Sequence, residues 1–413
     1  MDPERIATER PGTRVAVAGA GPGGITAALA LAQAGFHVRV FERADAVEAR
    51  GGAIVLNAIG LYILRHLGIS TDDLEPVSVS EFRRYDGRPR ARWRTDDALI
   101  RRAGSSGWIA GMMRSDLYAR MLDVVPEDMI VTDAKLGHYE EHDDAVTLHF
   151  ADGSTYEADV LIGADGIGSV VREQLWGQSE LRNLGINVWL GHAVLDGPPR
   201  TQMLMHHSDR HQFGFAPLRH HGQNCFEFWF VEALDERKPV PVDPIAHIRG
   251  NVAEFVYPVD DIVAATKPEN LYRWVVKGRP PLRSWSRGRV TLLGDAAHPT
   301  SPYAGYGAGM AIEDGYFLGR LLADRDLSDR AAVAEGLRRY DAQRVEYCNR
   351  VTGFARSMGR VFHNAPWPAR RLRDFMLDRT PIPRKLINRG YTDEAHELLE
   401  AILRADGVGS PAQ

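Results

Sequence analysis

A glycine-rich turn near the start of the chain constrains its fold more than any other feature. The segment Gly19-Ala20-Gly21-Pro22-Gly23-Gly24 follows a short apolar run at residues 15–18 and precedes an Ala- and Leu-rich stretch at residues 25–34. The apolar run is typical of a buried parallel strand, and the longer stretch is typical of a helix. The sequence therefore predicts a strand-to-helix turn whose glycines match the G-x-G-x-x-G pattern.

The glycines of this turn have separate physical roles. Gly19 permits the tight turn, Gly21 lets the backbone approach a pyrophosphate, and Gly24 allows the helix to pack closely on the strand. Free N–H groups at the helix N-terminus can then bind the phosphates. We assign Gly19, Gly21, Gly23 and Gly24 to a dinucleotide-binding site; a glycine turn in an ordinary βαβ unit is the alternative.

An acidic residue follows where such a site needs one. A second apolar run at residues 38–41 ends at Glu42, close to the position about twenty residues downstream at which the fingerprint places an acid. The Glu42 carboxylate can accept hydrogen bonds from an adenosine ribose.

Two further motifs lie far along the chain. Asp165-Gly166-Ile167-Gly168-Ser169-Val170-Val171-Arg172 follows an apolar run at residues 159–164, and Gly294-Asp295-Ala296-Ala297-His298-Pro299 follows another at residues 289–293. With these three motifs in this order, the chain resembles the group A flavoprotein monooxygenases. They form the para-hydroxybenzoate hydroxylase-like superfamily, and the resemblance is strongest to its salicylate hydroxylase-like branch.

This resemblance implies a cofactor and a reaction. FAD would carry the redox chemistry, and NAD(P)H would bind transiently and reduce it. In such enzymes dioxygen then adds to give a flavin C4a-hydroperoxide, whose distal oxygen attacks an electron-rich carbon. We therefore expect a monooxygenase that hydroxylates an aromatic or other electron-rich small molecule. The alternatives are a flavin-dependent epoxidase, reductase or halogenase of the same fold, or a non-enzymatic FAD-binding protein; the W-x-W segment of halogenases is absent from this sequence.

The resemblance also assigns residues of the later motifs to the cofactor. Asp295, in the same loop as Gly294, would hydrogen-bond the ribityl chain of FAD. Asp165, Gly166 and Arg172 would serve the pyrophosphate region and the nicotinamide donor.

Two arginines resemble basic positions of the family. Arg114 resembles an arginine that contacts the flavin cofactor, and Arg43, directly after Glu42, resembles a basic position on the adenosine side. A surface ion pair is the alternative for both.

A second glycine-rich turn, at residues 302–309, opens a helical pattern that continues to about residue 322. Backbone N–H groups at a helix start can stabilise the negative charge of reduced flavin, so Gly305, Gly307 and Ala308 are further cofactor positions. Many relatives have Gln and Asn where this chain has Tyr306 and Gly309. We therefore treat Tyr306 as a pocket residue and, with Pro302, as a catalytic candidate.

Hydroxylation of a phenol needs a dry pocket and often a base. We select His211 with Tyr306, and the other candidates are His206, His207 and Tyr303. A surface or turn position is the alternative for each histidine, including His220 and His221. His298, inside the third motif, is expected to pack and hydrogen-bond beside the flavin.

Alternating apolar segments at residues 213–218 and 226–230 predict antiparallel strands. Phe213 and Phe215 should share one face of their strand, whereas Phe228 and Trp229 must point to opposite faces. We expect the substrate to lie between the turn at residues 302–307 and the sheet that holds Phe213 and Phe215. Core packing is the alternative for these aromatic side chains.

Composition excludes other classes of protein. The 413 residues carry a net charge of −5, which gives no general affinity for nucleic acid. The only cysteines, Cys225 and Cys348, suggest neither a disulfide framework nor a metal site. An apolar signal segment and an apolar stretch of membrane-spanning length are both missing. We expect a cytoplasmic monomer or homodimer without a metal, whose partners are an aromatic small molecule and dioxygen rather than nucleic acid or membrane.

The motif positions imply an α/β chain, α+β overall, with a discontinuous Rossmann-type FAD-binding domain at residues 13–78, 112–182 and 286–330. Residues 79–111 and 183–285 are expected to form an inserted antiparallel-sheet domain for the substrate. Residues 331–413 are expected to form a C-terminal helical region.

Overall fold

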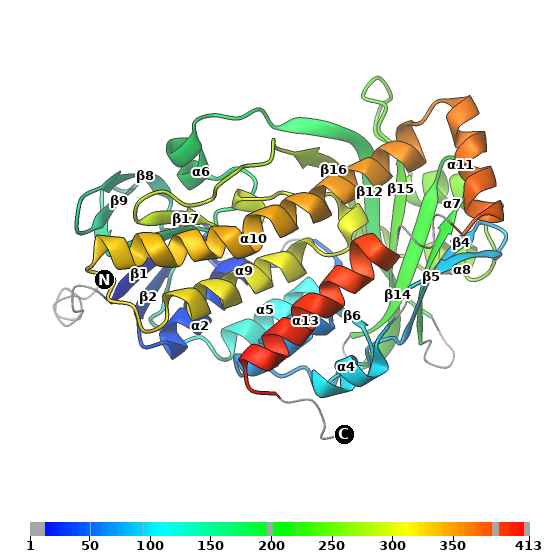
Figure 1. The fold of residues 1–413 in the computed structure, drawn as a ribbon. Helices are drawn as coiled ribbons and strands as arrows, with labels where there is room; N and C mark the ends of the chain where they lie inside the picture. The colour runs from blue at the N-terminus through cyan, green and yellow to red at the C-terminus, as the bar shows by residue number, and fades with distance from the viewer. Residues whose placement is uncertain are drawn as a thin grey trace.

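The computed structural model describes residues 13–49, 51–93, 95–195, 201–220, 222–381 and 388–408. His221 and the first twelve residues therefore lie outside the described part. Figure 1 shows an α/β region on the side of the N-terminus, a large sheet at the opposite end, and C-terminal helices that run between them.

A parallel sheet of five strands forms the α/β region, in the order β17-β11-β1-β2-β7. These strands are β1 (Arg14–Ala18), β2 (His37–Phe41), β7 (Ile130–Val131), β11 (Val160–Gly163) and β17 (Val290–Leu292). The strands that precede the three motifs, β1, β11 and β17, are neighbours in register: Val17 pairs with Ile162, and Ile162 pairs with Thr291. Because parallel strands end at the same sheet edge, the three motifs meet there.

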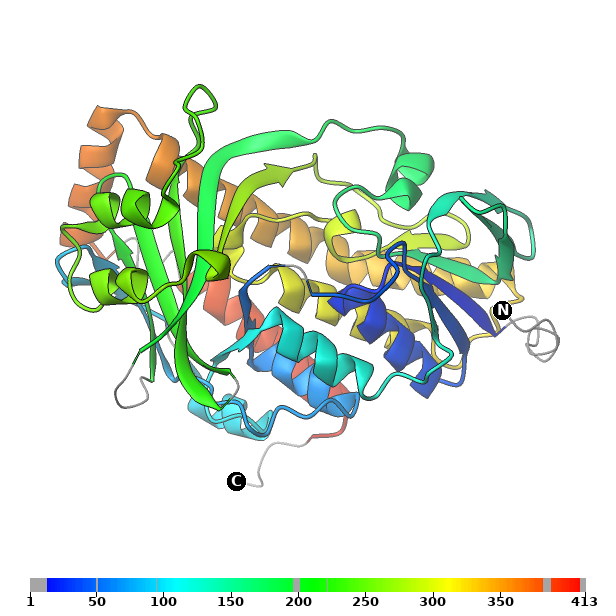
Figure 2. The same ribbon diagram turned by 180° about the vertical axis from the view of Figure 1, so that it is seen from behind.

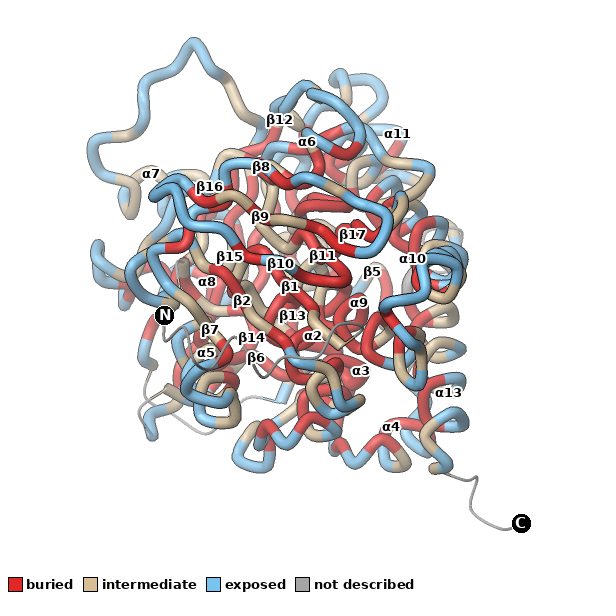
Figure 3. Tube along the Cα trace, turned by 90° about the vertical axis from the view of Figure 1, so that its left-hand side faces the viewer, coloured by how far each residue is buried: buried red, intermediate tan, exposed pale blue. Residues whose placement is uncertain are grey.

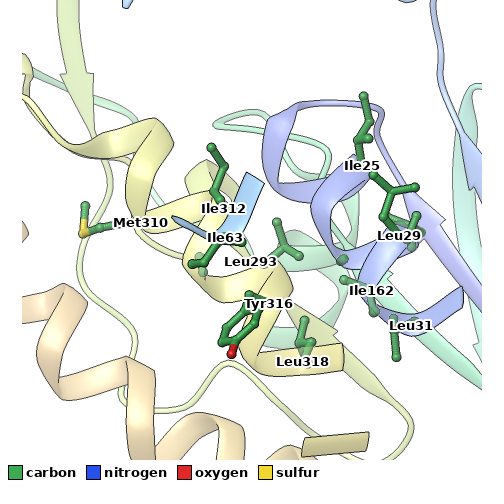
Figure 4. Close-up of a cluster of buried hydrophobic side chains, with 14 of the residues drawn as sticks. Ile25, Leu29, Leu31, Ile63, Ile162, Leu293, Met310, Ile312, Tyr316 and Leu318 are labelled. Carbon is green, nitrogen blue, oxygen red and sulfur yellow. The ribbon is translucent and has the colours of Figure 1, made fainter. Parts of the chain in front are cut away.

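Helices α2 (Pro22–Gln33) and α9 (Gly307–Leu322) pack against each other beside this sheet. Their close approach depends on glycine in α9, because a Cβ atom at Gly315 would lie 2.5 Å from the backbone nitrogen of Ala27, and one at Gly319 would lie 2.4 Å from Ala30 Cβ. Figure 4 shows the apolar core between the two helices and the sheet, with Ile25 and Leu29 from α2 and Ile312 and Leu318 from α9. This core fixes the start of α9 beside the glycine turn.

The second sheet has seven strands in the order β16-β12-β15-β14-β13-β4-β5. They are β4 (Val79–Arg84), β5 (Pro89–Arg92), β12 (Arg182–Val194), β13 (Gln202–His207), β14 (Gln212–His220), β15 (Gln223–Ala233) and β16 (Leu271–Gly278). Its pairings are antiparallel except that of β13 with β4, which is parallel. Both chain segments expected in a substrate domain contribute strands to it.

One face of this sheet is covered by α7 (Pro244–Val252) and α8 (Val259–Ala264), which pack on an aromatic layer of β14 and β15. Figure 2 shows these helices on the outer side of the sheet, away from the α/β region. The opposite face is turned toward the parallel sheet, so only that face can border a site shared by the two regions.

Smaller elements connect the two sheets. The two-stranded sheet of β3 (Ala53–Asn57) and β6 (Ile109–Met113) lies between them, and β8 (Leu136–Glu141), β9 (Val146–Phe150) and β10 (Thr155–Ala158) form a three-stranded sheet. The short helices are α3 (Ala58–His66), α4 (Asp97–Arg102), α5 (Arg114–Leu122) and α6 (Val170–Trp176), and the short 3₁₀ helices are η1 (Pro268–Asn270), η2 (Gly294–Ala296) and η3 (Pro302–Ala304).

The C-terminal part is helical, with α10 (Arg330–Gly359), η4 (Arg360–Asn364), α11 (Trp367–Arg379), η5 (Asn388–Asp393) and α13 (Glu394–Ala405). Figure 3 shows the buried segments concentrated in the parallel sheet and the helices beside it. Within the described ranges, no helix combines the length and apolar character that a membrane span requires. The expected Rossmann-type sheet, inserted mostly antiparallel sheet and C-terminal helices are confirmed.

Candidate active site

A cavity of about 1220 Å³ runs from the glycine turn to the large sheet and the C-terminal helices. Gly21, Gly166 and Asp295 line its first part, the turn that starts α9 lines its middle, and Trp229 of β15 lines its far part. All three motifs found in the sequence therefore border a single space.

The glycines of the first turn differ in the physical reason for which a side chain is excluded. A Cβ atom at Gly24 would lie 2.1 Å from the carbonyl oxygen of Gly19, and one at Gly23 would lie 2.8 Å from that of Ala311. Gly19 has a φ of +108°, which disfavours any other residue. A Cβ atom at Gly21, in contrast, would meet no protein atom within 4 Å and would point into open space beside the cavity. The described protein atoms therefore do not require glycine at this position, and the open space fits the approach of a pyrophosphate to the backbone.

Glu42 is fixed at the end of β2 by the backbone. Its two carboxylate oxygens accept hydrogen bonds from the N–H groups of Ala20, at 2.9 Å, and Ala44, at 3.1 Å. This places the carboxylate beside the glycine turn, as a ribose-binding role would require. Arg43 is exposed and is not part of the cavity wall.

Asp165 caps α6 instead of lining the cavity. Its Oδ2 accepts hydrogen bonds from the N–H groups of Val170, at 2.7 Å, and Val171, at 3.3 Å, and burial raises its pKa. Its Oδ1 is buried and has no hydrogen-bond partner among the described residues. The adjacent Gly166, with a φ of +78°, lines the cavity.

The structure does not bring Arg172 to the cavity. Its guanidinium donates hydrogen bonds to the carbonyl oxygens of Ala296, at 3.0 Å, Ala297, at 2.7 Å, and Pro280, at 2.7 Å. The side chain is fully buried, and burial lowers its pKa to about 10. The direct cofactor role expected for Arg172 therefore needs correction: it braces the loop that carries Asp295.

Asp295 lines the cavity at the start of this loop. Its side chain is exposed to this space, desolvation by the surrounding protein raises its pKa, and the charges of His298 and Arg114 partly oppose that effect. The preceding residue, Gly294, has a φ of +57° and donates its N–H to Asp314 Oδ2 at 3.0 Å. Asp295 thus faces the cavity from a loop whose backbone is hydrogen-bonded to Asp314 on the side away from the cavity.

A buried ionic network anchors that loop. His298 Nε2 lies 2.6 Å from Asp314 Oδ2, and Arg344 Nε donates to Asp314 Oδ1 at 2.8 Å. Burial alone would raise the pKa of Asp314, but the charges of His298 and Arg344 hold it below its ordinary value. His298 therefore packs and hydrogen-bonds behind the Gly294 loop, and the anchor also includes Arg344, which the motifs did not identify.

The turn before α9 borders the cavity with Pro302, Tyr303, Gly305, Tyr306, Gly307 and Ala308. The Tyr306 hydroxyl donates a hydrogen bond to the buried Glu313. The Tyr347 hydroxyl lies 3.3 Å from the Tyr306 hydroxyl. The Tyr306 ring thus borders the cavity while its hydroxyl is engaged inside the protein. A base role for Tyr306 is not supported by this geometry.

None of the candidate histidines that the structure describes lines the cavity. The His211 ring packs 5.4 Å from that of Phe230, in the outer aromatic layer, and burial lowers its pKa. His206 stacks against Phe215, and burial lowers its pKa to about 4. The prediction of His211 as the base is therefore wrong, because its side chain points to the aromatic layer under α7 and α8 and not into the cavity.

His207 and His220 have other partners. His207 packs between Phe82 and Phe362, with ring centroids 4.0 and 4.3 Å away, and burial lowers its pKa well below the ordinary value. His220 Nδ1 lies 3.2 Å from Asp116 Oδ2. These partners give both residues structural roles.

Strand alternation decides which aromatic residues reach the cavity. Phe213 and Phe215 face the outer layer, where Phe213 stacks on Phe228 at 5.2 Å. Trp229 points to the opposite face and lines the cavity, as the alternation predicts. The sheet borders the cavity as expected, but with the face opposite Phe213 and Phe215. Their core-packing alternative is therefore the correct one.

Glu227 is a residue of the cavity wall that none of the sequence motifs indicates. This residue of β15 is only 6% exposed, lines the cavity, and its Oε1 has no hydrogen-bond partner among the described residues. Burial raises its pKa to about 8, an effect that the charge of Arg114 partly opposes. Arg114 also lines the cavity. In the sequence, the feature that could have indicated Glu227 is its position as a single acidic residue between Phe226 and Phe228 in an apolar strand.

The sequence profile of a family described as FAD binding domain matches residues 12–355. The chain is 33% identical over 372 residues to 6-hydroxynicotinate 3-monooxygenase of Bordetella bronchiseptica, covering 86% of this chain and 91% of that protein. It is 31% identical over 367 residues to 3-hydroxybenzoate 6-hydroxylase of Polaromonas naphthalenivorans, covering 84% of this chain and 88% of that one.

Solved structures agree with these sequence matches. The fold superposes on that of Klebsiella pneumoniae HpxO complexed with FAD and uric acid with a TM-score of 0.80 at 28% identity, covering 92% of this chain and 96% of the other. The chain therefore belongs to the FAD-binding monooxygenases of the para-hydroxybenzoate hydroxylase-like group A, and it is an FAD-dependent enzyme of the aromatic hydroxylase type.

Proposed function

We propose that the protein uses NAD(P)H and dioxygen to hydroxylate an aromatic substrate that carries an ionisable hydroxyl group. The observation that carries this proposal is the continuous cavity between the FAD motifs and the inner face of the large sheet. Bound FAD supplies the electron transfer and oxygen activation, while the protein binds, orients and shields the reactants. The substrate would lie between the start of α9 and Trp229.

The cavity-lining backbone supports a binding mode for FAD. Gly21 and Gly166 leave room for a pyrophosphate, and the N–H groups of Gly307 and Ala308 stand at the open end of a sixteen-residue helix. The partial positive charge there would stabilise a negatively charged flavin ring. Asp295 would accept hydrogen bonds from ribityl hydroxyls, and Glu42 would hold the ribose.

The same arrangement predicts the effect of Asp295→Ala. The variant is expected to bind FAD with an occupancy well below that of the parent, because a cofactor hydroxyl loses its acceptor, while the fold persists. Absorbance of the purified protein near 450 nm, relative to that at 280 nm, measures the occupancy. Asp295→Asn keeps one acceptor oxygen and is expected to retain more FAD. Equal occupancy in all three proteins would remove Asp295 from the site.

Glu227 is the side chain best placed to take a proton from the substrate. It lines the cavity, its Oε1 has no hydrogen-bond partner within the described part of the chain, and a base is most effective when its pKa is near the working pH. Its pKa of about 8 meets that condition. The role expected for His211 is accordingly assigned to Glu227.

Glu227→Gln tests this role because glutamine keeps the shape and removes the base. Substrate-stimulated turnover is expected to fall by about 10²- to 10⁴-fold, with FAD content unchanged. In the parent, the basic form of Glu227 becomes dominant as the pH rises through about 8, so the rate should increase over that range. The variant should lose this increase in its pH–rate profile.

Glu232→Gln is the matched control on the same strand, since Glu232 accepts a hydrogen bond from Trp189 Nε1 and is not part of the cavity wall. It is expected to keep the parental pH–rate profile. An unchanged profile in Glu227→Gln would refute the assignment of the base.

The overall activity is tested by oxygen consumption. The purified yellow protein should oxidise NAD(P)H slowly alone and faster with a suitable phenolic compound, with equimolar loss of dioxygen and formation of a hydroxylated product. Reduction of the flavin without oxygen transfer to any aromatic compound would favour a reductase. Bound FAD that no donor reduces would favour a non-enzymatic role.

A further inference from the structure

The far end of the cavity is built almost entirely from apolar side chains. Helices α10 and α11 and the large sheet contribute these residues, which include Trp93, Met205, Met358, Leu372, Met376 and Leu377. Two aromatic residues of the same wall, Phe82 and Phe362, pack together with ring centroids 5.4 Å apart. This end is separate from the motifs that bind FAD.

Several of these apolar side chains retain exposed surface. Leu372 is 60% exposed and Val361 of η4 is 41% exposed, and both line the cavity. Met358 and Met376 are only partly buried. Unbranched methionine side chains adapt to irregular apolar shapes, and a ligand that covers apolar surface gains free energy in proportion to the area covered. The cavity end therefore favours an apolar ligand group.

The described residues of the cavity wall offer no unpaired cation at this end for an acidic ligand. Among the described residues of the cavity wall, the only cations are Arg114, at the flavin end, and Arg373 of α11. Arg373 donates to the carbonyl oxygens of Val361, Phe362 and Asp209 and forms an ion pair with Asp374 at 2.9 Å. Its guanidinium is thus fully occupied within the protein.

The charged groups that remain are acidic. Glu394, which pairs with Arg350 at 3.5 Å, lines the cavity together with Glu227 and Asp295, and none of these carboxyl groups could neutralise a carboxylate on a ligand. An anionic substrate group that covered this apolar surface would lose hydration without gaining a counter-ion from the described cavity wall, which is unfavourable.

We propose that the apolar end of the cavity binds a bulky, uncharged alkyl or polycyclic group of the substrate, so that the enzyme acts on lipophilic hydroxyaromatic compounds in preference to small aromatic acids. This inference rests on the proposed function and specifies its substrate class. The hydroxylated ring would lie between Trp229 and the start of α9, and the apolar group would extend along α11.

A binding titration tests the proposal without requiring turnover. The FAD-loaded protein is titrated with 4-ethylphenol, 4-butylphenol, 4-hexylphenol and 3-(4-hydroxyphenyl)propionate, and binding is followed by the change in flavin absorbance. Affinity should rise by up to about fourfold for each methylene group that becomes buried. The propionate should bind more weakly than 4-butylphenol, which has a chain of similar length.

A charge substitution at the apolar end locates the effect. Met376→Arg is expected to abolish the gain in affinity with alkyl length and to improve binding of the propionate. Phe375→Arg is the matched control, since Phe375 is the preceding residue of α11, is 60% exposed, and is not part of the cavity wall. The control should bind the whole series as the parent does, and FAD content verifies that both variants fold.

Affinity that does not increase with alkyl length, or a propionate that binds more tightly than 4-butylphenol, would overturn this inference. Such a result would leave the proposed function standing if NAD(P)H oxidation is stimulated by an aromatic acid. Conversely, a lack of donor oxidation with every compound would contradict the proposed function, while the titration would still report on the apolar end.

Discussion

Replacement of Gly21 by valine is expected to yield a folded, colourless protein that no longer binds FAD. The backbone of Gly21 is extended, with φ −69° and ψ 171°, which valine adopts readily. A Cβ atom there meets no protein atom within 4 Å, so the fold has no steric reason to reject it. The added methyl groups would instead occupy the space where the pyrophosphate approaches the backbone.

Visible absorbance measures bound FAD in this variant, and circular dichroism with thermal unfolding of the apoproteins measures the fold. Gly24→Ala is the informative comparison, because its Cβ atom would lie 2.1 Å from the carbonyl oxygen of Gly19. That smaller substitution is expected to lower the thermal stability of the apoprotein, whereas Gly21→Val is expected to leave it near that of the parent. Full FAD affinity in Gly21→Val would show that no ligand approaches the turn.

The FAD-binding sheet could be predicted from the sequence because its signals are local. Residues 15–18 predict a strand that the structure extends by one residue to Arg14–Ala18, and the glycine turn leads into α2 as predicted. The adjacency of the motif strands followed from topology, since parallel strands bring their carboxyl ends to one edge. Asp295 accordingly borders the same cavity as Gly21.

The faces of the large sheet could not be predicted in the same way. Alternation separates Phe213 and Phe215 from Gln212 and Gly214, but it does not say which set α7 and α8 will cover. The aromatic set was the more conspicuous one, and it forms the outer core. The face with Gln212 and Gly214 borders the cavity instead. Trp229 packs over Gly214 there, and a Cβ atom at Gly214 would lie 2.1 Å from the Trp229 ring.

Arg172 and Glu227 show a related limit. An arginine in a cofactor motif suggests a contact with phosphate, yet Arg172 binds carbonyl groups of a loop more than a hundred residues away. Glu227 lies in no motif and is a single carboxylate within an aromatic strand. Its value as a base depends on burial that only the tertiary structure provides. In both cases the tertiary surroundings, not the residue type, determine the role.

The second large effect is expected from the network behind the Gly294 loop. Asp314 is fully buried and accepts hydrogen bonds from the Gly294 N–H and from Arg344, besides its contact with His298. Arg344 is 1% exposed, and its Nη2 lies 2.8 Å from Glu313 Oε2. Glu313 compensates this charge only in part, because burial raises its pKa to about 7. Asp314 is therefore the principal counter-ion of Arg344.

Asp314→Ala is expected to lower the free energy of unfolding by about 3–5 kcal/mol, since removal of one partner leaves a buried charge uncompensated. Urea denaturation of the apoprotein measures the loss, and FAD content should fall as well because the Gly294 N–H loses its acceptor. Asp314→Asn, which keeps one acceptor oxygen, should lose less stability.

The double variant Asp314→Ala with Arg344→Met separates the charge effect from simple loss of packing. Removing Arg344 takes away one of the two cations that Asp314 compensates, the other being His298, so the double variant should be more stable than Asp314→Ala alone. FAD affinity should nevertheless stay low in the double variant, because methionine does not restore the acceptor for Gly294. If the second substitution instead lowered stability further by its own independent amount, Asp314 and Arg344 would not be coupled, and Asp314 would hold the loop only through Gly294 and His298.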